Sequence, residues 1–128
     1  MSFLTPLLKE SQSAFKLINR RNGRILAEQV ITAFDSQTRR RGLLGRDSFQ
    51  PGHALIIAPT NAIHTWFMRF PIDVAFIARD GRVVKVRHQL GPWRMSGALR
   101  GYAVIEFPAG TLAAADTIAD DDLSLERF

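Results

Sequence analysis

The feature that most constrains the fold is a pair of β-rich runs, "IDVAFIAR" and "RVVKVRHQ", on either side of Asp80-Gly81. An Asp-Gly dipeptide between two such runs is a strong signal for a β-hairpin with a tight turn. If these two residues form the loop, the register places Asp73 beside His88 on one face of the hairpin. A one-residue bulge would break that pairing, because a single step reverses every side chain beyond it.

Turn and strand signals recur along the rest of the chain. Asn22-Gly23 divides two strand-like runs within residues 14–34, so a second hairpin is expected there. Further strands are expected in residues 53–59, 102–108 and 121–128, a short helix in residues 109–116 and a long loop in residues 91–101.

One more short helix is expected over residues 37–44. Asp35 or Ser36 can accept hydrogen bonds from the exposed amides at its start, and Gly45 suits a left-handed stop. The side chains that should turn toward the core are those of Leu43 and Leu44.

Together these elements predict an α+β domain in which β structure dominates. We expect a compact, mostly antiparallel sheet, barrel-like or sandwich-like, with one or two short helices. A chain of 128 residues, 46% of them hydrophobic, is long enough to bury one core. Residues 1–12 are expected to form a flexible leader and residues 13–128 a single globular domain.

The charges are unevenly distributed. Residues 1–48 carry nine basic and four acidic side chains, a balance of +5, whereas residues 101–128 carry one and six, a balance of −5. The acidic end can therefore lie against a basic segment and cancel part of its field. A basic total describes loose attraction to polyanions and does not specify a partner.

Several classes of protein are excluded by composition. The chain contains no cysteine, so disulfides, thiolate catalysis and cysteine-ligated metals are ruled out. No apolar run approaches the roughly 20 residues that cross a bilayer, and Pro6 interrupts the apolar start without a basic leader before it. We therefore expect a cytoplasmic protein with no membrane partner.

The segment "IHTWFMRFPID", residues 63–73, concentrates polar and aromatic types. One interpretation is a ligand pocket, because pockets combine apolar walls with a few orienting polar groups. The apolar walls would come from Trp66, Phe67 and Met68, and the polar groups from His64, Thr65, Arg69 and Asp73. The other interpretation is a core strand followed by a turn at Phe70-Pro71.

Two catalytic interpretations use neighbouring residues. His64, Asp73 and His88 could form an acid–base centre, but no evident substrate-activating group accompanies them. A serine or threonine nucleophile is disfavoured, because no G-x-S-x-G elbow is present. Together with His53, the same three residues could also hold zinc or iron, although their spacing matches no metal-site signature. We expect neither a metal nor another cofactor.

Arginines gather around the first hairpin and the predicted helix. Arg41 and Arg46 could bind an anionic ligand, or pair with Asp116 or Glu106 and only stabilise the fold. No nucleic-acid reading motif accompanies this charge, so we do not expect nucleic acid as a partner. Trp93, in the expected glycine-rich loop, could close over a ligand or plug the end of a barrel.

These motifs as a set are similar to a known family. A helix ending in "RGLLGR", then "IHTWFMRFPIDVAFIARDGRVVKV", a Pro-Trp loop and "YAVIEFPAGTLAAAD" resemble the bacterial and archaeal domain of unknown function 192 family. The resemblance covers residues 13–126 and implies a compact β-rich fold without implying an activity. The chain departs from the family pattern at "TIADDDL", where relatives tend to have a glycine-aspartate turn before the last strand.

Our interpretation is a binding or accessory module with one pocket for a small polar or anionic ligand. Its walls would be Trp66, Met68 and Trp93, and its polar edge His64, Asp73 and His88, with Arg69 attracting the ligand. The alternatives are an acid–base or metal-assisted hydrolase built from the same residues, and a structural domain that docks a protein through a sheet edge or an arginine face.

Overall fold

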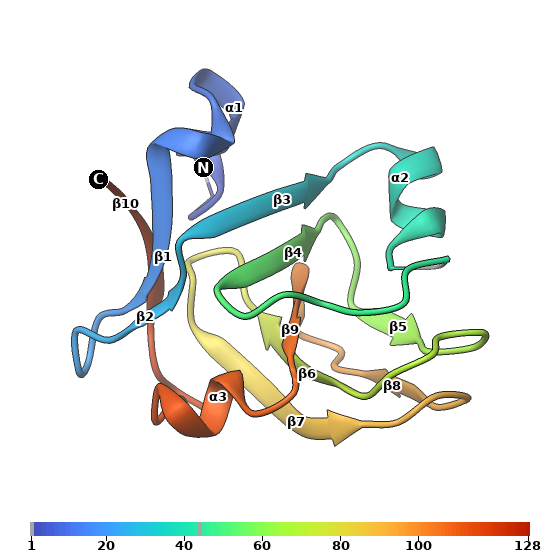
Figure 1. The fold of residues 1–128 in the computed structure, drawn as a ribbon. Helices are drawn as coiled ribbons and strands as arrows, with labels where there is room; N and C mark the ends of the chain where they lie inside the picture. Colours follow the sequence, from blue (N-terminus) through green and yellow to red (C-terminus); the bar gives the residue numbers. More distant parts are fainter. Residues whose placement is uncertain (1, 44) are drawn as a thin grey trace.

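The computed structural model describes residues 2–43 and 45–128, and Figure 1 shows its elements. The helices are α1 (Thr5–Lys9), α2 (Ser36–Arg41), α3 (Thr111–Ala114) and the 3-10 turn η1 (Gln12–Ala14). The strands are β1 (Phe15–Asn19), β2 (Ile25–Ala27), β3 (Gln29–Ala33), β4 (His53–Ile57), β5 (Ala62–His64), β6 (Ile72–Ile77), β7 (Val83–Leu90), β8 (Met95–Gly97), β9 (Ala103–Pro108) and β10 (Leu123–Arg127).

The described residues form three sheets. The central sheet has five strands in the order β3-β4-β9-β6-β7, a three-stranded sheet has the order β10-β1-β2, and β5 pairs with β8. All pairs are antiparallel except β3 and β4, which are joined by the crossover that contains α2. The prediction of a β-dominated α+β domain with sandwich-like sheets is confirmed, with three short α-helices where one or two were expected.

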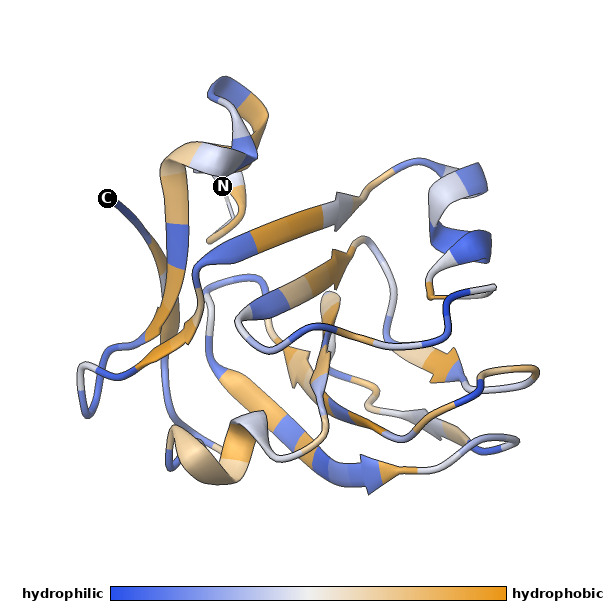
Figure 2. Ribbon diagram, viewed as in Figure 1, coloured by the Kyte–Doolittle hydropathy of each residue, from blue (hydrophilic) through white to orange (hydrophobic). Residues whose placement is uncertain are grey.

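Both faces of the central sheet are buried in apolar clusters. Along β9 the side chains alternate, so Ile105 and Phe107 belong to the apolar cluster beneath α3, and Val104 belongs to the cluster on the α2 side. Figure 2 shows β3 and β4 as largely apolar and α2 as largely hydrophilic. On the α2 side the apolar cover of the sheet therefore comes from residues outside the helix, Leu43, Phe49 and Met68 among them.

The hairpin of β6 and β7 has the predicted register in its middle and departs from it at both ends. Val74 pairs with Arg87, Ala75 with Val86 and Phe76 with Lys85, as expected. The loop holds three residues, because the Ala78 amide donates to the Arg82 carbonyl at 2.8 Å. A bulge beyond the loop therefore changes the partner of Ile77 from the expected Val84 to Val83. A second bulge changes the register between Ile72 and Val74.

Gly81 cannot be replaced without strain in this loop. Its φ is +98°, and a Cβ there would lie 2.6 Å from the Leu123 carbonyl oxygen. The glycine of the Asp-Gly signal thus serves both the turn and the close approach of the last strand.

The second bulge overturns one specific prediction. Asp73 does not pair with His88, because the extra residue in β7 brings the Gln89 amide to Asp73 Oδ1 at 2.9 Å. Gln89 has a φ of +49° at this bulge. A bulge of this kind is set by tertiary contacts, and the alternation of β7 gives no sign of it.

Most of the other predicted elements are confirmed. Asn22-Gly23 connects the antiparallel strands β1 and β2, and Asp35 accepts from the Thr38 amide at 2.7 Å at the start of α2. Leu43 is buried, whereas Leu44 lies outside the described residues. Helix α2 ends at Arg41 with Gly42 as its cap, earlier than the expected stop at Gly45.

The prediction of one long loop over residues 91–101 is wrong for the middle of this segment. Residues 95–97 form β8 and pair with β5, with His64 opposite Met95 and Ala62 opposite Gly97. Three-residue strands with little apolar alternation carry a weak signal in a sequence, and their pairing depends on where the neighbouring strands lie.

The acidic C-terminal stretch lies against the basic first hairpin, as the charge distribution allowed. Asp121 accepts from Arg21 Nε at 2.6 Å and from Asn19 Nδ2 at 2.8 Å. The hydrogen bond from Arg21 is the main reason that the pKa of Asp121 falls to about 2. Asp116 also pairs with Arg21, and not with Arg41 or Arg46.

A turn and the strand β10 form at "TIADDDL" even though this segment departs from the family pattern. Asp120 takes a φ of +76° there, a conformation that aspartate adopts more readily than most residues. Strand β10 then pairs with β1 along its whole length, from Leu123 opposite Asn19 to Arg127 opposite Phe15.

The first residues contact the core. Leu4 is 2% exposed and belongs to the cluster beneath α3, and the Phe3 amide donates to the Arg79 carbonyl at 2.9 Å. Within residues 2–43 and 45–128, no helix reaches the length and apolarity that crossing a bilayer requires.

Candidate functional site

Glu106 is a carboxylic acid in the middle of the central sheet. It lies on β9, with Leu55 of β4 and Val74 of β6 as its direct neighbours across the sheet. Both neighbours are buried, and Glu106 itself is 3% exposed. Buried glutamates are usually paired, because removing a carboxylate from water is costly.

No such pairing is found for Glu106. In the described part of the chain, neither an amide nor a side chain donates a hydrogen bond to its carboxyl, and no arginine or lysine lies within ion-pair distance. Burial alone raises the pKa of Glu106 to about 7. A buried acid with a pKa near neutrality is typical of functional sites.

The Glu106 carboxyl opens into a cavity of about 130 Å³ on the α2 face of the sheet. Its lining residues come from α2 and the turn after it, from β4, from the segment around β5, and from β9. They are Arg39, Arg40, Arg41, Gly42, Leu43, Ile57, Thr60, Ala62, Ile63, His64, Met68 and Glu106. The cavity thus combines apolar walls with one buried acid and several nitrogen-bearing side chains.

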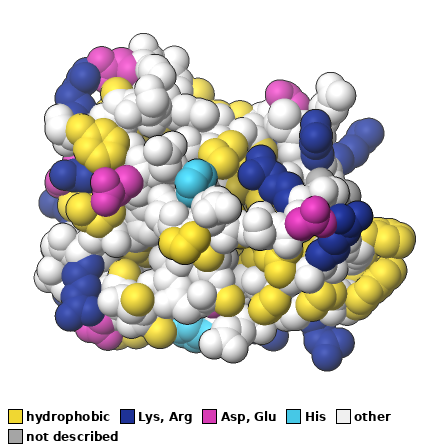
Figure 3. Space-filling model, in the orientation of Figure 1, with side chains coloured by type: hydrophobic (Ala, Val, Ile, Leu, Met, Phe, Trp, Pro, Cys, Tyr) yellow, Lys and Arg dark blue, Asp and Glu magenta, His cyan; other side chains and the backbone are white. Residues whose placement is uncertain are grey.

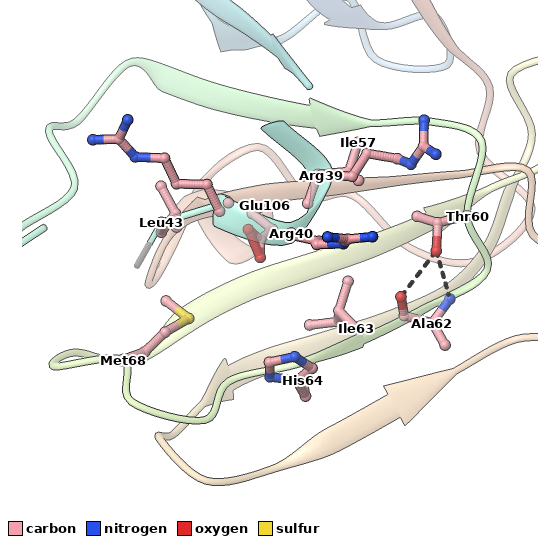
Figure 4. Close-up of a pocket in the computed structure, with 12 residues that line it drawn as sticks. Arg39, Arg40, Leu43, Ile57, Thr60, Ala62, Ile63, His64, Met68 and Glu106 are labelled. Atoms are coloured by element: carbon pink, nitrogen blue, oxygen red, sulfur yellow. Dashed lines mark hydrogen bonds between the residues drawn. The ribbon is translucent and has the colours of Figure 1, made fainter. Parts of the chain in front are cut away.

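The basic side of the cavity comes from the last turn of α2. Arg39 donates to the Phe34 carbonyl at 2.7 Å, which ties this side chain to the backbone. Arg40 and Arg41 take part in none of the ion pairs found among the described residues. Figure 4 shows the Arg40 side chain and the Glu106 carboxyl directed into the same space, with His64 and Met68 across from them.

Of the ten residues predicted to bind a ligand, three line this cavity: Arg41, His64 and Met68. Arg46 is exposed and does not line it. Arg69 is also exposed and pairs with Asp47, and His88 is exposed on β7. The structure therefore brings together a small part of the predicted set.

Asp73 is fully buried and holds the start of α3. Its Oδ2 accepts from the amides of Gly110 and Leu112, each at 3.0 Å, and its Oδ1 accepts from Gln89. The carboxylate therefore satisfies three backbone donors, which is a structural role.

Thr65 is also fully buried and joins two loops. Its hydroxyl donates to the Gly91 carbonyl at 2.6 Å and accepts from the Arg94 amide at 2.9 Å. These bonds fasten the loop between β5 and β6 to the loop between β7 and β8.

Replacing Thr65 by valine keeps the volume and removes both hydrogen bonds. We expect the free energy of unfolding to fall by about 1–3 kcal/mol, because the Gly91 carbonyl and the Arg94 amide lose their partner. Urea denaturation measures this directly. Thr32→Val is the matched control, since the Thr32 hydroxyl bonds only to the exposed Gln12 side chain. An equal loss in both variants would contradict the joining role.

The two tryptophans lie outside the cavity. Trp66 is 42% exposed and Trp93 is 58% exposed, and the ring of Trp93 packs edge-on against Phe67 at 4.7 Å between centroids. The His64 ring lies 4.9 Å from that of Trp66, at the edge of the cavity. Neither indole therefore lines the cavity that His64 and Met68 border.

The residues predicted to form an acid–base centre or a metal site do not lie together either. Asp73 faces the start of α3, whereas His64 lines the cavity on the α2 face of the sheet. Among residues 2–43 and 45–128, no three His, Cys, Asp or Glu side chains gather closely enough to hold a metal ion.

Glu106 was not predicted to bind a ligand, although the sequence around it is unusual. Glu106 stands inside "YAVIEFP", where its neighbours on both sides are buried strand residues. A charged residue inside an apolar strand run is anomalous, because its burial costs free energy unless something compensates it. The cavity itself needs α2 and Met68 in place and could not be predicted from a pattern.

Two crystal structures share this fold. One is titled a "putative transcription regulator" from Sinorhizobium meliloti 1021, with a TM-score of 0.75, 24% identity and coverage of 87% of this chain and 91% of that chain. The other is a protein of unknown function from Novosphingobium aromaticivorans DSM 12444, with a TM-score of 0.74, 18% identity and coverage of 86% and 82%. At these identities the likeness concerns the fold alone.

A comparison with curated proteins gave no match. The DUF192 family, described as an uncharacterized ACR, matches residues 17–125, which include every strand of the central sheet and the buried glutamate on β9. The resemblance seen in the sequence motifs is therefore confirmed, and the chain belongs to the DUF192 family.

Proposed function

We propose that this protein is a binding module for a small polar ligand, held in the cavity between α2 and the central sheet. The observation that carries the proposal is Glu106, an acid that is 3% exposed, has no hydrogen-bond donor among the described residues and borders the cavity. A ligand group that donates to this carboxyl would offset its cost of burial.

The chemistry of the cavity narrows the ligand class. A hydrogen-bond donor or a cation fits Glu106, and a carboxylate or phosphate fits the guanidinium groups of Arg40 and Arg41. A cavity of about 130 Å³ is small beside typical drug-sized sites, so the ligand should have few heavy atoms. A small zwitterion, such as an amino or guanidino acid, satisfies both requirements at once.

A thermal-shift screen of small amino acids, guanidino acids and simple carboxylates tests this proposal. We expect some zwitterions to raise the melting temperature of the wild type, because a ligand that binds only the folded state stabilises it. Glu106→Gln keeps the shape of the side chain and should lose the response to ligands with a cationic group. The double variant Arg40→Gln with Arg41→Gln should lose the response to their anionic group.

The matched control is Arg46→Gln, which removes an exposed arginine that does not line the cavity. It should respond as the wild type does. His64→Ala probes the edge of the same cavity, and a weakened response is expected there too. Identical ligand responses in the wild type, in Glu106→Gln and in the arginine double variant would overturn the proposal.

A second candidate function rests on the same acid. A carboxyl with a pKa of about 7 exchanges protons readily near neutral pH, which suits a general acid or base. This interpretation requires turnover of a bound compound. Release of urea in overnight incubations with a bound guanidino acid, which water cleaves to urea and the amino acid, therefore distinguishes it from simple binding. Wild-type turnover that Glu106→Gln abolishes would favour catalysis over simple binding.

A further inference from the structure

Four large side chains project from two neighbouring loops and have no place in the cavity. Trp66 and Phe67 follow β5, Trp93 and Met95 lie at the start of β8, and their exposed fractions run from 42% to 68%. We call these four residues the aromatic tip. The Phe67 and Trp93 rings are in contact. His64 lies opposite Met95 across β5 and β8, and its ring is 4.9 Å from that of Trp66.

The tip is held in place by the backbone behind it. Phe67 and Trp93 have φ values of +66° and +64°, a region that bulky residues rarely adopt. The carbonyl of Thr65 accepts from the amides of both Met68 and Trp93 at 3.1 Å, and the Thr65 hydroxyl fixes Arg94. Strained backbone that the surrounding structure holds is most often found at functional positions.

Exposed arginines adjoin the tip in the sequence. Residues 60–72 and 86–101 contain four arginines and no aspartate or glutamate. Arg94 is exposed between Trp93 and Met95, and the Arg69 side chain, which pairs with Asp47, is 61% exposed. Figure 3 shows hydrophobic side chains at the edge of the molecule where these loops lie in Figure 1, with both basic and acidic side chains beside them.

We propose that the aromatic tip inserts into the headgroup region of an anionic lipid surface while the surrounding arginines bind the lipid phosphates. Tryptophan and phenylalanine on a projecting edge bury apolar area at the membrane interface, and each nearby arginine adds electrostatic attraction. This peripheral contact needs no membrane-spanning segment. The four tip residues do not line the cavity, and this contact goes beyond the binding function proposed above.

Single-stranded nucleic acid is the competing partner for aromatic and basic side chains. Base stacking needs open ring faces, one for each base. Here the edge-on contact between Phe67 and Trp93 occupies part of their surface, and Met95 offers no ring at all. The lipid surface is therefore the better chemical match for the tip.

Intrinsic fluorescence tests the proposal cleanly, because both tryptophans of the chain belong to the tip. We expect a blue shift of the emission when vesicles of equal parts phosphatidylcholine and phosphatidylglycerol are added, and no shift with phosphatidylcholine alone. Co-sedimentation with the same vesicles gives the partition coefficient. Phe67→Ser combined with Met95→Ser keeps both reporters and should weaken partitioning about tenfold, because the buried apolar area is lost.

The matched control is Leu8→Ser on α1, since Leu8 is 71% exposed, much like Phe67 and Met95, but lies outside the tip. This control should partition as the wild type does. Arg94→Gln should reduce binding to anionic vesicles and flatten its dependence on salt. Substitutions of exposed residues leave the fold intact, which circular dichroism verifies for each variant.

Two results would overturn the proposal. One is a wild type that shows neither a blue shift nor co-sedimentation with the anionic vesicles. The other is a double variant that partitions as strongly as the wild type. A blue shift with a single-stranded oligonucleotide in place of vesicles would assign the tip to nucleic acid. The thermal-shift response of Glu106→Gln is measured without lipid, so failure of the cavity proposal is detected separately.

Discussion

Replacing Asp73 by alanine is expected to lower the free energy of unfolding by about 4 kcal/mol. The reason is the number of donors that the carboxylate satisfies. The amides of Gln89, Gly110 and Leu112 all donate to it, and Asp73 is fully buried. Alanine would leave these amides without an acceptor in a site that water enters poorly.

Urea denaturation at neutral pH measures the effect. Asp73→Asn keeps one carbonyl oxygen and should lose roughly half as much stability, because some of the amides retain an acceptor. Asp122→Ala is the control, since Asp122 is exposed and its side chain makes no hydrogen bond to the described residues. We expect that control to lie within about 0.5 kcal/mol of the wild type. A loss below about 1 kcal/mol for Asp73→Ala would show that the carboxylate does not hold α3.

Glu106 makes the stability of the wild type depend on pH in the opposite sense to most carboxylates. Its pKa is about 7 in the folded state and 4.5 in a solvated chain, so the folded state binds the proton more tightly. The contribution of Glu106 to stability therefore falls as the pH rises from 4.5 to about 7 and is nearly constant on either side of this window. This difference between the two pKa values corresponds to a change of about 3 kcal/mol in the free energy of unfolding.

The measurement compares the wild type with Glu106→Gln across that window. The glutamine does not titrate, so the stability of the wild type relative to the variant should fall by about 3 kcal/mol between about pH 4 and about pH 8. Glu126→Gln, which changes an exposed glutamate, should track the wild type at every pH. Parallel curves for the wild type and Glu106→Gln would mean that the buried carboxyl is solvated or paired in solution.

Local chemistry explains why much of the fold could be predicted. The turns at Asn22-Gly23 and Asp80-Gly81 and the cap at Asp35 depend on a few adjacent residues, so the sequence alone carries them. The two bulges of β7 do not follow from local preference. One depends on the three-residue loop at Gly81, and the other on the amide that meets Asp73.

The candidate site was harder to predict because its members come from four separate segments. His64, Met68 and Arg41 were identified by residue type, but the segment around His64 also contains Thr65, Trp66 and Arg69, which serve other purposes. Alternation along a strand does not say which face will meet a helix that crosses over from a distant segment. The position of α2 over β9 decides that Glu106, and not Asp73, borders a cavity.

The pairing of β1 with β10 has a consequence for synthesis of the protein. Phe15 lies opposite Arg127, so β1 can pair with β10 only after the chain has been made as far as residue 127. Contacts between residues so far apart in the sequence form slowly, because closing the long loop between them costs entropy before the contacts stabilise the chain. On the ribosome, the nascent β1 therefore waits with one edge unpaired, and the three-stranded sheet is completed only after translation of β10.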